Sequence, residues 1–483
     1  MAGIDAAYIA AWLLPALVGS GVWIVARGVV RAPADVVTTV GAGWLIGIVI
    51  AAGCARFAAA TDTAHAFAHA WPWCAAIGVA AWIGAIARLR GQRLRFIARP
   101  EPLRVALRVV WWLLLVWIVM RLALLGNEAS LRPVFPWDGW SAWAVKPKTW
   151  FLLGHAEPYV SMLDWLANPQ LAVRTVASWG YPELLAWIEL WFASAAGAWN
   201  EPLVDVAWCG ALVAFSLAAY GYWRALGLQS WLALALVYVL VSLPLIDAHV
   251  ALAGYADLWL ALTLGLATLA WVRWMIEGER GQLALAACLA LCLPAIKLEG
   301  TVWLLTFGAV IALDLLPRRW RWPIVGGLAV VTIVAIAAGA VGPVSVTWNS
   351  IEIPSLGTFA IAWHGVGSSM VASLFTLPNW HLFWYAVPVL FVMRRQRFGS
   401  DRAARMLGLM LLLDFVFLFV LFFLTTASTW AQDFTSANRL ILQLVPSVIV
   451  LAATLLRPLP GDAAVSAARL RTAEASTRPS VPA

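Results

Sequence analysis

The 483-residue chain has little charge: Asp, Glu, Lys and Arg make up only 12% of it, whereas 63% of its residues are hydrophobic. This scarcity excludes a water-soluble globular fold, and the usual relation between length and number of domains does not apply. Several apolar stretches exceed the roughly 20 residues that a helix needs to cross a hydrocarbon core. The composition therefore predicts an all-α integral membrane protein, because helices satisfy their own backbone hydrogen bonds in lipid.

The chain also lacks the cysteine and histidine patterns of disulfide or metal sites. Its cysteines all lie within apolar stretches, at Cys54, Cys74, Cys209, Cys288 and Cys292. Their spacing fits neither a disulfide framework nor a metal site, so we interpret them as packing residues. The histidines His155, His249 and His364 likewise lack the spacing of metal ligands. We assign no metal ligand, and the sequence leaves a divalent cation cofactor open.

No basic segment precedes the first apolar run, because residues 1–14 contain Asp5 but no Lys or Arg. They do not resemble a secretory signal, and we expect this run to remain in the mature protein. No internal repeat or long linker divides the chain. We expect residues 1–104 to form an N-terminal transmembrane extension and residues 105–457 to form the main membrane domain. Residues 458–483, rich in Ala, Ser, Arg and Pro, should be a disordered cytoplasmic tail.

The net charge of +8 comes from arginines in short loops between apolar runs. Such arginines act as topology signals, because cytoplasmic loops carry an excess of positive charge. Three arginine-rich segments, 88–108, 318–321 and 394–405, are therefore predicted to be cytoplasmic. This distribution gives no support to nucleic-acid binding.

Apolar runs predict the transmembrane helices. They lie at 7–26, 37–56, 67–87, 105–125, 183–198, 203–223, 231–248, 257–275, 282–294, 299–316, 323–343, 371–393, 404–424 and 439–457. Alternation from the cytoplasmic loops places residues 126–180, 344–370 and 425–438 outside. The count closes only if the short run 183–198 lies in the outer leaflet. We therefore expect about thirteen crossings.

Residues 135–148, here named the tryptophan segment, combine aromatic and ionisable side chains in a membrane protein. Its tryptophans recur at intervals of three, at Trp137, Trp140 and Trp143. They would form one face of a short interfacial helix that ends at Pro147. Asp138 could be no more than the N-cap of that helix. However, a cap does not require the nearby Lys146 and Lys148, whereas a site for a phosphorylated substrate needs cations.

Four further motifs follow the tryptophan segment. They are Gly-Tyr-Pro-Glu-Leu-Leu at 180–185, Gly-Tyr-Ala-Asp at 254–257, Lys-Leu-Glu-Gly at 297–300 and Thr-Ser-Ala-Asn-Arg-Leu-Ile-Leu-Gln-Leu-Val-Pro at 435–446. Together, the five motifs resemble the family 39-type and related glycosyltransferases of the GT-C membrane fold. This superfamily includes protein mannosyltransferases and lipid A sugar transferases. The resemblance covers about residues 105–457 and implies a GT-C-like helical bundle with short interfacial helices in an external loop.

The resemblance implies transfer of a sugar from a polyprenyl-phosphate donor to an envelope acceptor, which could be a glycan, a lipid or a protein. The active site would face outward from the inner (cytoplasmic) membrane, and Asp138 matches the family's catalytic carboxylate. Family members often carry a second acid next to that carboxylate and a His-Pro-Pro sequence before the following helix. Here Gly139 follows Asp138 and Tyr181-Pro182-Glu183 follows Gly180. These departures weaken the case for a protein acceptor.

The same residue types suit this chemistry independently of the family. An inverting transfer needs a base, which Asp138 can supply, and cations that stabilise the departing lipid phosphate. Candidate cations are Lys146, Lys148, Lys297 and Arg439. Sugar rings also stack on aromatic side chains. Expected substrate contacts therefore also include Trp137, Trp140, Trp143, Tyr181, Glu183, Asp257 and Glu299.

Other interpretations remain open at the sequence level. Asp257 and Glu299 each begin an apolar helix, where the helix dipole alone favours a carboxylate. Lys297 and Glu299 could simply pair with each other. The rival function is a transporter or flippase of lipid-linked saccharides. Transporters commonly carry charges near the membrane midplane, whereas the charged motifs here lie at the ends of the predicted spans. A catalytically inactive scaffold is the third alternative.

Overall fold

The computed structural model describes residues 5–27, 35–90, 95–96, 101, 103–169, 171–317, 319–321, 323, 345–347, 349–353 and 357–458. The predicted span 323–343 lies almost wholly outside the described residues. All but the first residue of the predicted tail 458–483 also lies outside them.

Eight helical segments in the described part of the chain are long and apolar enough to cross a membrane. They are α1 (Ala6–Arg27), α2 (Val36–Ala58), η1 with α3 (Thr63–His65 and Ala66–Leu89), α4 (Val105–Leu131), α8 (Glu201–Ala225), α11 (Ala256–Glu277), α18 (Arg402–Leu424) and α20 (Ser436–Leu456). These helices confirm the predicted all-α, multi-pass membrane class. The predicted count of thirteen crossings is not confirmed.

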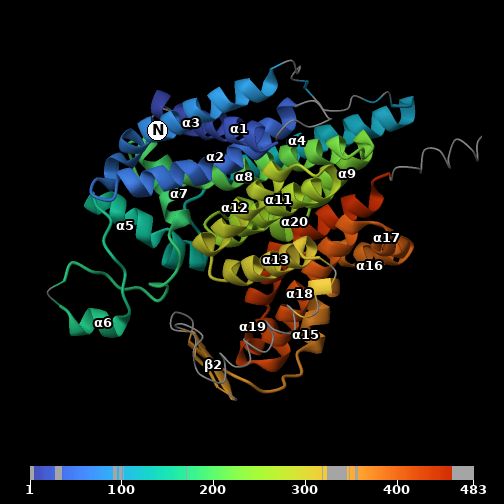
Figure 1. The fold of residues 1–483 in the computed structure, drawn as a ribbon. Helices are drawn as coiled ribbons and strands as arrows, with labels where there is room; N and C mark the ends of the chain where they lie inside the picture. The colour runs from blue at the N-terminus through green and yellow to red at the C-terminus, as the bar shows by residue number, and fades with distance from the viewer. Residues whose placement is uncertain are drawn as a thin grey trace, which may run out of the picture.

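Helices α11 and α20 pack together at the centre of the bundle, which is visible in Figure 1. Helices α8, α12 (Arg280–Ile296) and α18 pack against α11. By contrast, α4 lies at the edge and exposes Trp112, Leu113 and Val116 along its length. An apolar surface of this size suits contact with lipid chains rather than water.

The first helices join the same bundle through small residues. A Cβ atom added to Gly47 of α2 would lie 1.8 Å from the carbonyl oxygen of Pro15 in α1, so only glycine permits this approach. Close contacts of this kind are typical of helix pairs in membranes. Helix α2 also packs against α8 and against α7 (Leu184–Ala195). The N-terminal extension is therefore in direct contact with the helices that follow it.

Two predicted spans are not continuous helices. Residues 231–248 form α9 (Ser230–Val241) and α10 (Pro244–Ala251), which meet at an angle of 62°. Residues 371–393 are divided between α15 (Gly367–Val371), the π-helix η3 (Ala372–Thr376) and α16 (Phe383–Met393). A proline lies at each break: Pro244 begins α10, and Pro378 lies between η3 and α16. Proline cannot donate the backbone hydrogen bond that a helix interior requires.

Three further helices are short for a crossing. Helix α7 has 12 residues and is about 18 Å long, against a hydrocarbon core of about 30 Å. This length agrees with the expectation that 183–198 does not cross. Helices α12 and α13 (Gly300–Leu315) have 17 and 16 residues. Each is therefore shorter than the roughly 20 residues that a crossing helix needs.

The remaining elements lie mainly at two ends of the bundle. The π-helix η2 (Gly139–Trp143), α5 (Val145–Leu153) and α6 (Met162–Ala167) fill the segment in which short helices were expected. The predicted external segment 344–370 also contains a small antiparallel sheet of β1 (Ser345–Val346), β2 (Ser350–Ile353) and β3 (Gly357–Ala360). In Figure 1, α5 and α6 lie at the left end of the bundle and α17 (Arg395–Ser400) at the right. The short elements η4 (Thr426–Ser428) and α19 (Thr429–Gln432) join α18 to α20.

All five cysteines are free. Cys54, Cys74 and Cys209 are buried, as predicted for packing residues. Cys288 instead is exposed on α12, so packing does not account for it. An exposed position on an apolar helix is compatible with a thiol, because the side chain is a small hydrophobe.

Candidate functional site

Asp257, near the N-terminus of α11, is fully buried and accepts hydrogen bonds from three side chains. Its Oδ1 atom accepts from Lys297 Nζ at 2.7 Å and from Gln443 Nε2 at 2.6 Å. Its Oδ2 atom accepts from Arg439 Nε at 3.0 Å and from Nη2 at 2.8 Å. Asp257 is the second residue of α11, whose N-cap residue is Tyr255. A buried carboxylate persists only when it is paired in this way, so Asp257 fixes the positions of two cations.

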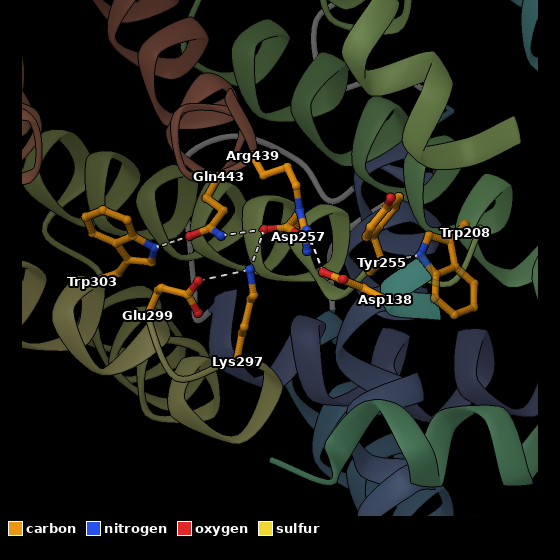
Figure 2. Close-up of polar contacts among 9 residues, drawn as sticks. All are labelled: Asp138, Trp208, Tyr255, Asp257, Lys297, Glu299, Trp303, Arg439 and Gln443. Atoms are coloured by element: carbon orange, nitrogen blue, oxygen red, sulfur yellow. Dashed lines mark hydrogen bonds and ion pairs between the residues drawn. The ribbon is translucent and has the colours of Figure 1, made fainter. Parts of the chain in front are cut away.

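Both cations also reach a second, more exposed carboxylate. Arg439 Nη1 donates to Asp138 Oδ2 at 2.5 Å, and Lys297 Nζ lies 2.9 Å from Glu299 Oε1. The exposed fractions of the Asp138 and Glu299 side chains are 34% and 24%. We name these five residues the charge network. Figure 2 shows Arg439 extending between Asp257 and Asp138, with Lys297 reaching Asp257 from the other side.

The charge network joins four of the five sequence motifs. Its members come from the tryptophan segment, the start of α11, the turn between α12 and α13, and the start of α20. The acidic motifs at 254–257 and 297–300 therefore lie on the same side of the bundle as Asp138. The pairing of Lys297 with Glu299 is confirmed. Three carboxylates and two cations leave one net negative charge when all five groups are ionised.

Two glycines bring the Asp138 and Asp257 backbones together. A Cβ atom added to Gly254 would lie 3.1 Å from the Cα atom of Gly139, and Gly254 has a φ of +114°. A Cβ atom on Gly139 would lie 2.8 Å from Cγ1 of Val134. Glycine is the residue that tolerates both the close approach and the positive φ. The close approach to Gly254 therefore gives a structural reason for glycine at position 139.

Gln443 and Tyr255 contact the charge network, and a tryptophan side chain donates a hydrogen bond to each of them. Gln443 lies one helical turn after Arg439 on α20, and its Oε1 atom accepts from Trp303 Nε1 at 2.7 Å. The guanidinium of Arg439 also lies 4.5 Å from the ring centre of Tyr255, a cation–π contact. Trp208 Nε1 donates to the Tyr255 carbonyl at 2.8 Å. Sequence reasoning missed these residues. The i, i+4 spacing of Arg439 and Gln443 was the available signal.

The tryptophan segment does not form the predicted helix. Residues 139–143 form a π-helix, in which the Ala144 amide donates to the Gly139 carbonyl at 2.7 Å. This wider turn disperses residues spaced by three, which share one face only in an α-helix. Consequently Trp143 is buried against Tyr181, whereas the exposed fractions of Trp137 and Trp140 are 70% and 48%.

Two further expectations about this segment are wrong. Pro147 does not end a helix but lies in the first turn of α5, where a missing amide hydrogen costs nothing. The alternative that Asp138 is only a cap is also wrong: Asp138 occupies the N-cap position of η2, but its side chain makes no capping bond and instead pairs with Arg439.

Lys146 is a buried structural residue rather than an accessible cation. Its Nζ atom donates to the carbonyls of Trp179 at 2.9 Å and Tyr181 at 2.8 Å. Burial lowers the pKa of Lys146 to about 8, and the negative charge of Glu183 opposes this shift. The ammonium group thereby fastens the 179–181 segment to α5. Such a side chain does not fit the predicted contact with substrate phosphate.

The remaining predicted residues lie around the charge network or away from it. Lys148 pairs with Glu201 at 2.7 Å, and Glu183 lies 3.8 Å from Arg56. Burial raises the pKa of the Tyr181 hydroxyl, which also feels the charges of the network, Lys297 first. Tyr181 therefore borders the network, while neither Lys148 nor Glu183 is paired with any of its members.

No cluster of three or more His, Cys, Asp or Glu side chains in the described ranges could hold a metal ion. The positive charges of the site are instead those of Arg439 and Lys297. Lys297 is buried between Asp257 and Glu299, whereas Arg439 pairs with Asp138, which is partly exposed. No protein-family model, curated protein or solved structure matches the chain.

Proposed function

We propose that this chain is a membrane glycosyltransferase of the GT-C type, which transfers a sugar from a polyprenyl-phosphate donor to an envelope acceptor. The observation that carries the proposal is the contact between Asp138 and Arg439. A partly exposed carboxylate lies beside a cation that a buried carboxylate holds in place. Transfer from a phosphate-linked sugar requires this combination of an accessible base and a fixed positive charge.

In this mechanism Asp138 takes the proton of the acceptor hydroxyl as its oxygen attacks C1 of the sugar. The bond between C1 and the phosphate oxygen breaks, and the lipid phosphate leaves from the opposite face with inversion at C1. Arg439 stabilises the negative charge on the departing phosphate, and Lys297 adds to the positive field. Asp257 does not act on substrate, because it is fully buried and already accepts four hydrogen bonds. It is a positioning residue.

In this proposed function, the site would lie on the outer face of the inner membrane. The arginine-rich turn around α17 lies at the opposite end of the bundle from α5 and α6 in Figure 1. Positive loops favour the cytoplasm, so the tryptophan segment would face outward. The lipid-linked donor would then enter from the outer leaflet.

The proposal is tested by deleting the gene and restoring it as wild type, Asp138→Asn or Glu157→Gln. Mass spectrometry of envelope glycans, lipids and proteins should show loss of one sugar mass on deletion and its return with wild type. Loss of a general base typically slows a reaction about 10²- to 10⁴-fold, so Asp138→Asn should fail to restore the sugar at equal membrane levels. Glu157→Gln is the matched control, because Glu157 pairs with Arg174 outside the charge network. Full restoration by Asp138→Asn would remove Asp138 from the catalytic role.

A second candidate is a flippase of lipid-linked saccharides, and the bend between α9 and α10 is the observation that favours it. Broken helices often form substrate sites in transporters. A flippase would move the lipid-linked sugar across vesicle membranes without changing any covalent bond. Transbilayer movement in vesicles, with donor and acceptor masses unchanged, would support this candidate over the enzyme.

A further inference from the structure

The donors of Arg439 are divided between two unlike carboxylates. Nε and Nη2 bind Asp257, which is fully buried, whereas Nη1 binds Asp138. Asp257 also holds Lys297 and Gln443, while Arg439 is the charged side chain paired with Asp138 among the described residues. The Arg439 guanidinium therefore has one fully buried partner, Asp257, and one partly exposed partner, Asp138.

The two contacts differ in how easily a ligand could replace them. Separating Arg439 from Asp257 would remove both hydrogen bonds at Oδ2 of a fully buried carboxylate and leave Lys297 as its one paired cation, which is strongly unfavourable. Asp138 can instead be rehydrated on release, because about a third of its side chain is already exposed. Ion pairs with access to water contribute little net stability. Nη1 is therefore the position at which Arg439 can exchange partners.

The charge balance makes this exchange necessary for an anionic ligand. The charge network carries one net negative charge when all its groups are ionised, so an incoming phosphate would be repelled as it approached Arg439. Most of that repulsion would come from Asp138, since its carboxylate already touches Nη1. A phosphoryl oxygen and a carboxylate both accept hydrogen bonds from a guanidinium, so one can take the place of the other.

We propose that Asp138 masks a phosphoryl-binding position on Arg439 in the unliganded protein, and that the phosphoryl group of the ligand displaces it. The inference rests on the proposed function for the chemistry of the ligand and adds how the site is regulated. Displacement releases Asp138 from its ion pair at the moment when the donor is bound. The base is thereby available only when a substrate is present.

The test is equilibrium binding to the full-length protein in nanodiscs, with a polyprenyl phosphate and, separately, inorganic phosphate as probes. Asp138→Asn removes the competing charge at constant size and should tighten binding of a phosphoryl probe about tenfold. Asp138→Glu keeps the charge and should bind as wild type does. Arg439→Gln should lose binding, and Glu157→Gln should leave it unchanged. The uncharged polyprenol corrects for binding of the lipid tail alone.

Tighter binding of inorganic phosphate to Asp138→Asn than to wild type would show that the phosphoryl group alone is sufficient. Tighter binding of the polyprenyl phosphate but not of inorganic phosphate would show that the lipid also contributes to recognition. Either result supports the mask. Equal affinities of wild type and Asp138→Asn, with loss of binding in Arg439→Gln, would overturn it while leaving the phosphate site of the proposed function intact. Equal weakening by Asp138→Asn and Asp138→Glu would also overturn it, since the side chain would then support binding. If wild type and Asp138→Asn bind neither phosphoryl probe, the phosphate-linked donor itself fails, and the mask fails with it.

Discussion

At the scale of single residues, the site depends on which charges are buried and which remain accessible. Asp257 is fully enclosed and organises Arg439 and Lys297, while Asp138 keeps contact with solvent. A carboxylate with four hydrogen bonds is a poor base, because its charge is already satisfied. Asp138 is therefore the better candidate for proton transfer, although both acids are equally prominent in the sequence.

The Gly139–Gly254 contact yields a prediction at this scale. Gly254→Ala should separate the two backbones and move Asp138 relative to Arg439, because the added Cβ would lie 3.1 Å from a Cα atom. Displacements of about 1 Å at a catalytic group can cost about 100-fold in rate, so the rate of the proposed sugar transfer should fall about 10- to 100-fold. The rate is measured in membranes with equal protein levels.

Gly154→Ala provides the matched control for the Gly254→Ala variant. Gly154 also has a positive φ, +79°, but a Cβ atom there would meet no atom within 4 Å. It carries the backbone strain without the contact, a strain of about 1–2 kcal/mol. Equal loss of rate in both variants would attribute the effect to strain and contradict the role of the glycine contact.

At the scale of elements, the bend between α9 and α10 is stabilised by a side chain from a neighbouring helix. Arg121 of α4 donates through Nε to the Val241 carbonyl at 2.8 Å, at the end of α9, and forms an ion pair with Asp247 of α10. The last carbonyls of a helix have no partner within that helix. Arg121 supplies one and at the same time holds the start of α10.

We expect Arg121→Met to destabilise the protein by about 1–3 kcal/mol, because it leaves Asp247 and the Val241 carbonyl without their partner. Thermal unfolding in detergent measures this change. The double variant Arg121→Met with Asp247→Asn should regain part of the loss, since the unpaired charge is gone. Arg108→Met, an exposed position on the same helix, is the control. If Arg121→Met destabilised the protein no more than Arg108→Met does, the contacts of Arg121 with Val241 and Asp247 would contribute nothing to stability.

At the scale of the whole molecule, charge gathers at two ends that are separated by apolar helices. Helix α11 has 22 residues and is about 33 Å long, with Asp257 near its first residue and the Arg273–Glu277 pair in its last turn. The second end also contains the Arg402–Asp314 and Arg457–Asp401 ion pairs, at 2.8 and 2.9 Å. The distance between the ends matches the thickness of a hydrocarbon core.

The arginines at the second end predict how the protein is oriented in the membrane. Cysteines introduced at Lys148 and Glu352 should react with an impermeant thiol reagent added to intact cells, whereas one at Ser400 should react only after permeabilisation, because the arginines around α17 favour the cytoplasm. The protein with only its native thiols gives the baseline, including exposed Cys288. Reaction at Ser400 in intact cells without reaction at Lys148 would reverse the orientation.

The membrane class and most helices could be predicted from the sequence, because a long apolar run is a local property that the bilayer stabilises as a helix. Runs such as 37–56, 203–223 and 404–424 correspond to α2, α8 and α18. The site motifs could also be located, since ionisable residues at the ends of apolar runs are costly and therefore few. Asp138, Asp257, Lys297, Glu299 and Arg439 were all identified in this way.

Only the tertiary structure decided which of these groups meet, because ion pairs and backbone contacts form between segments far apart in the chain. The sequence could not distinguish Lys146, whose donors are taken by the carbonyls of Trp179 and Tyr181, from Arg439, which lies 301 positions from Asp138 and binds it. Burial, which sets the energy of each charge, is likewise a property of the packed bundle. It separates the enclosed Asp257 from the accessible Asp138, and it is fixed only once α11 and α20 have come together.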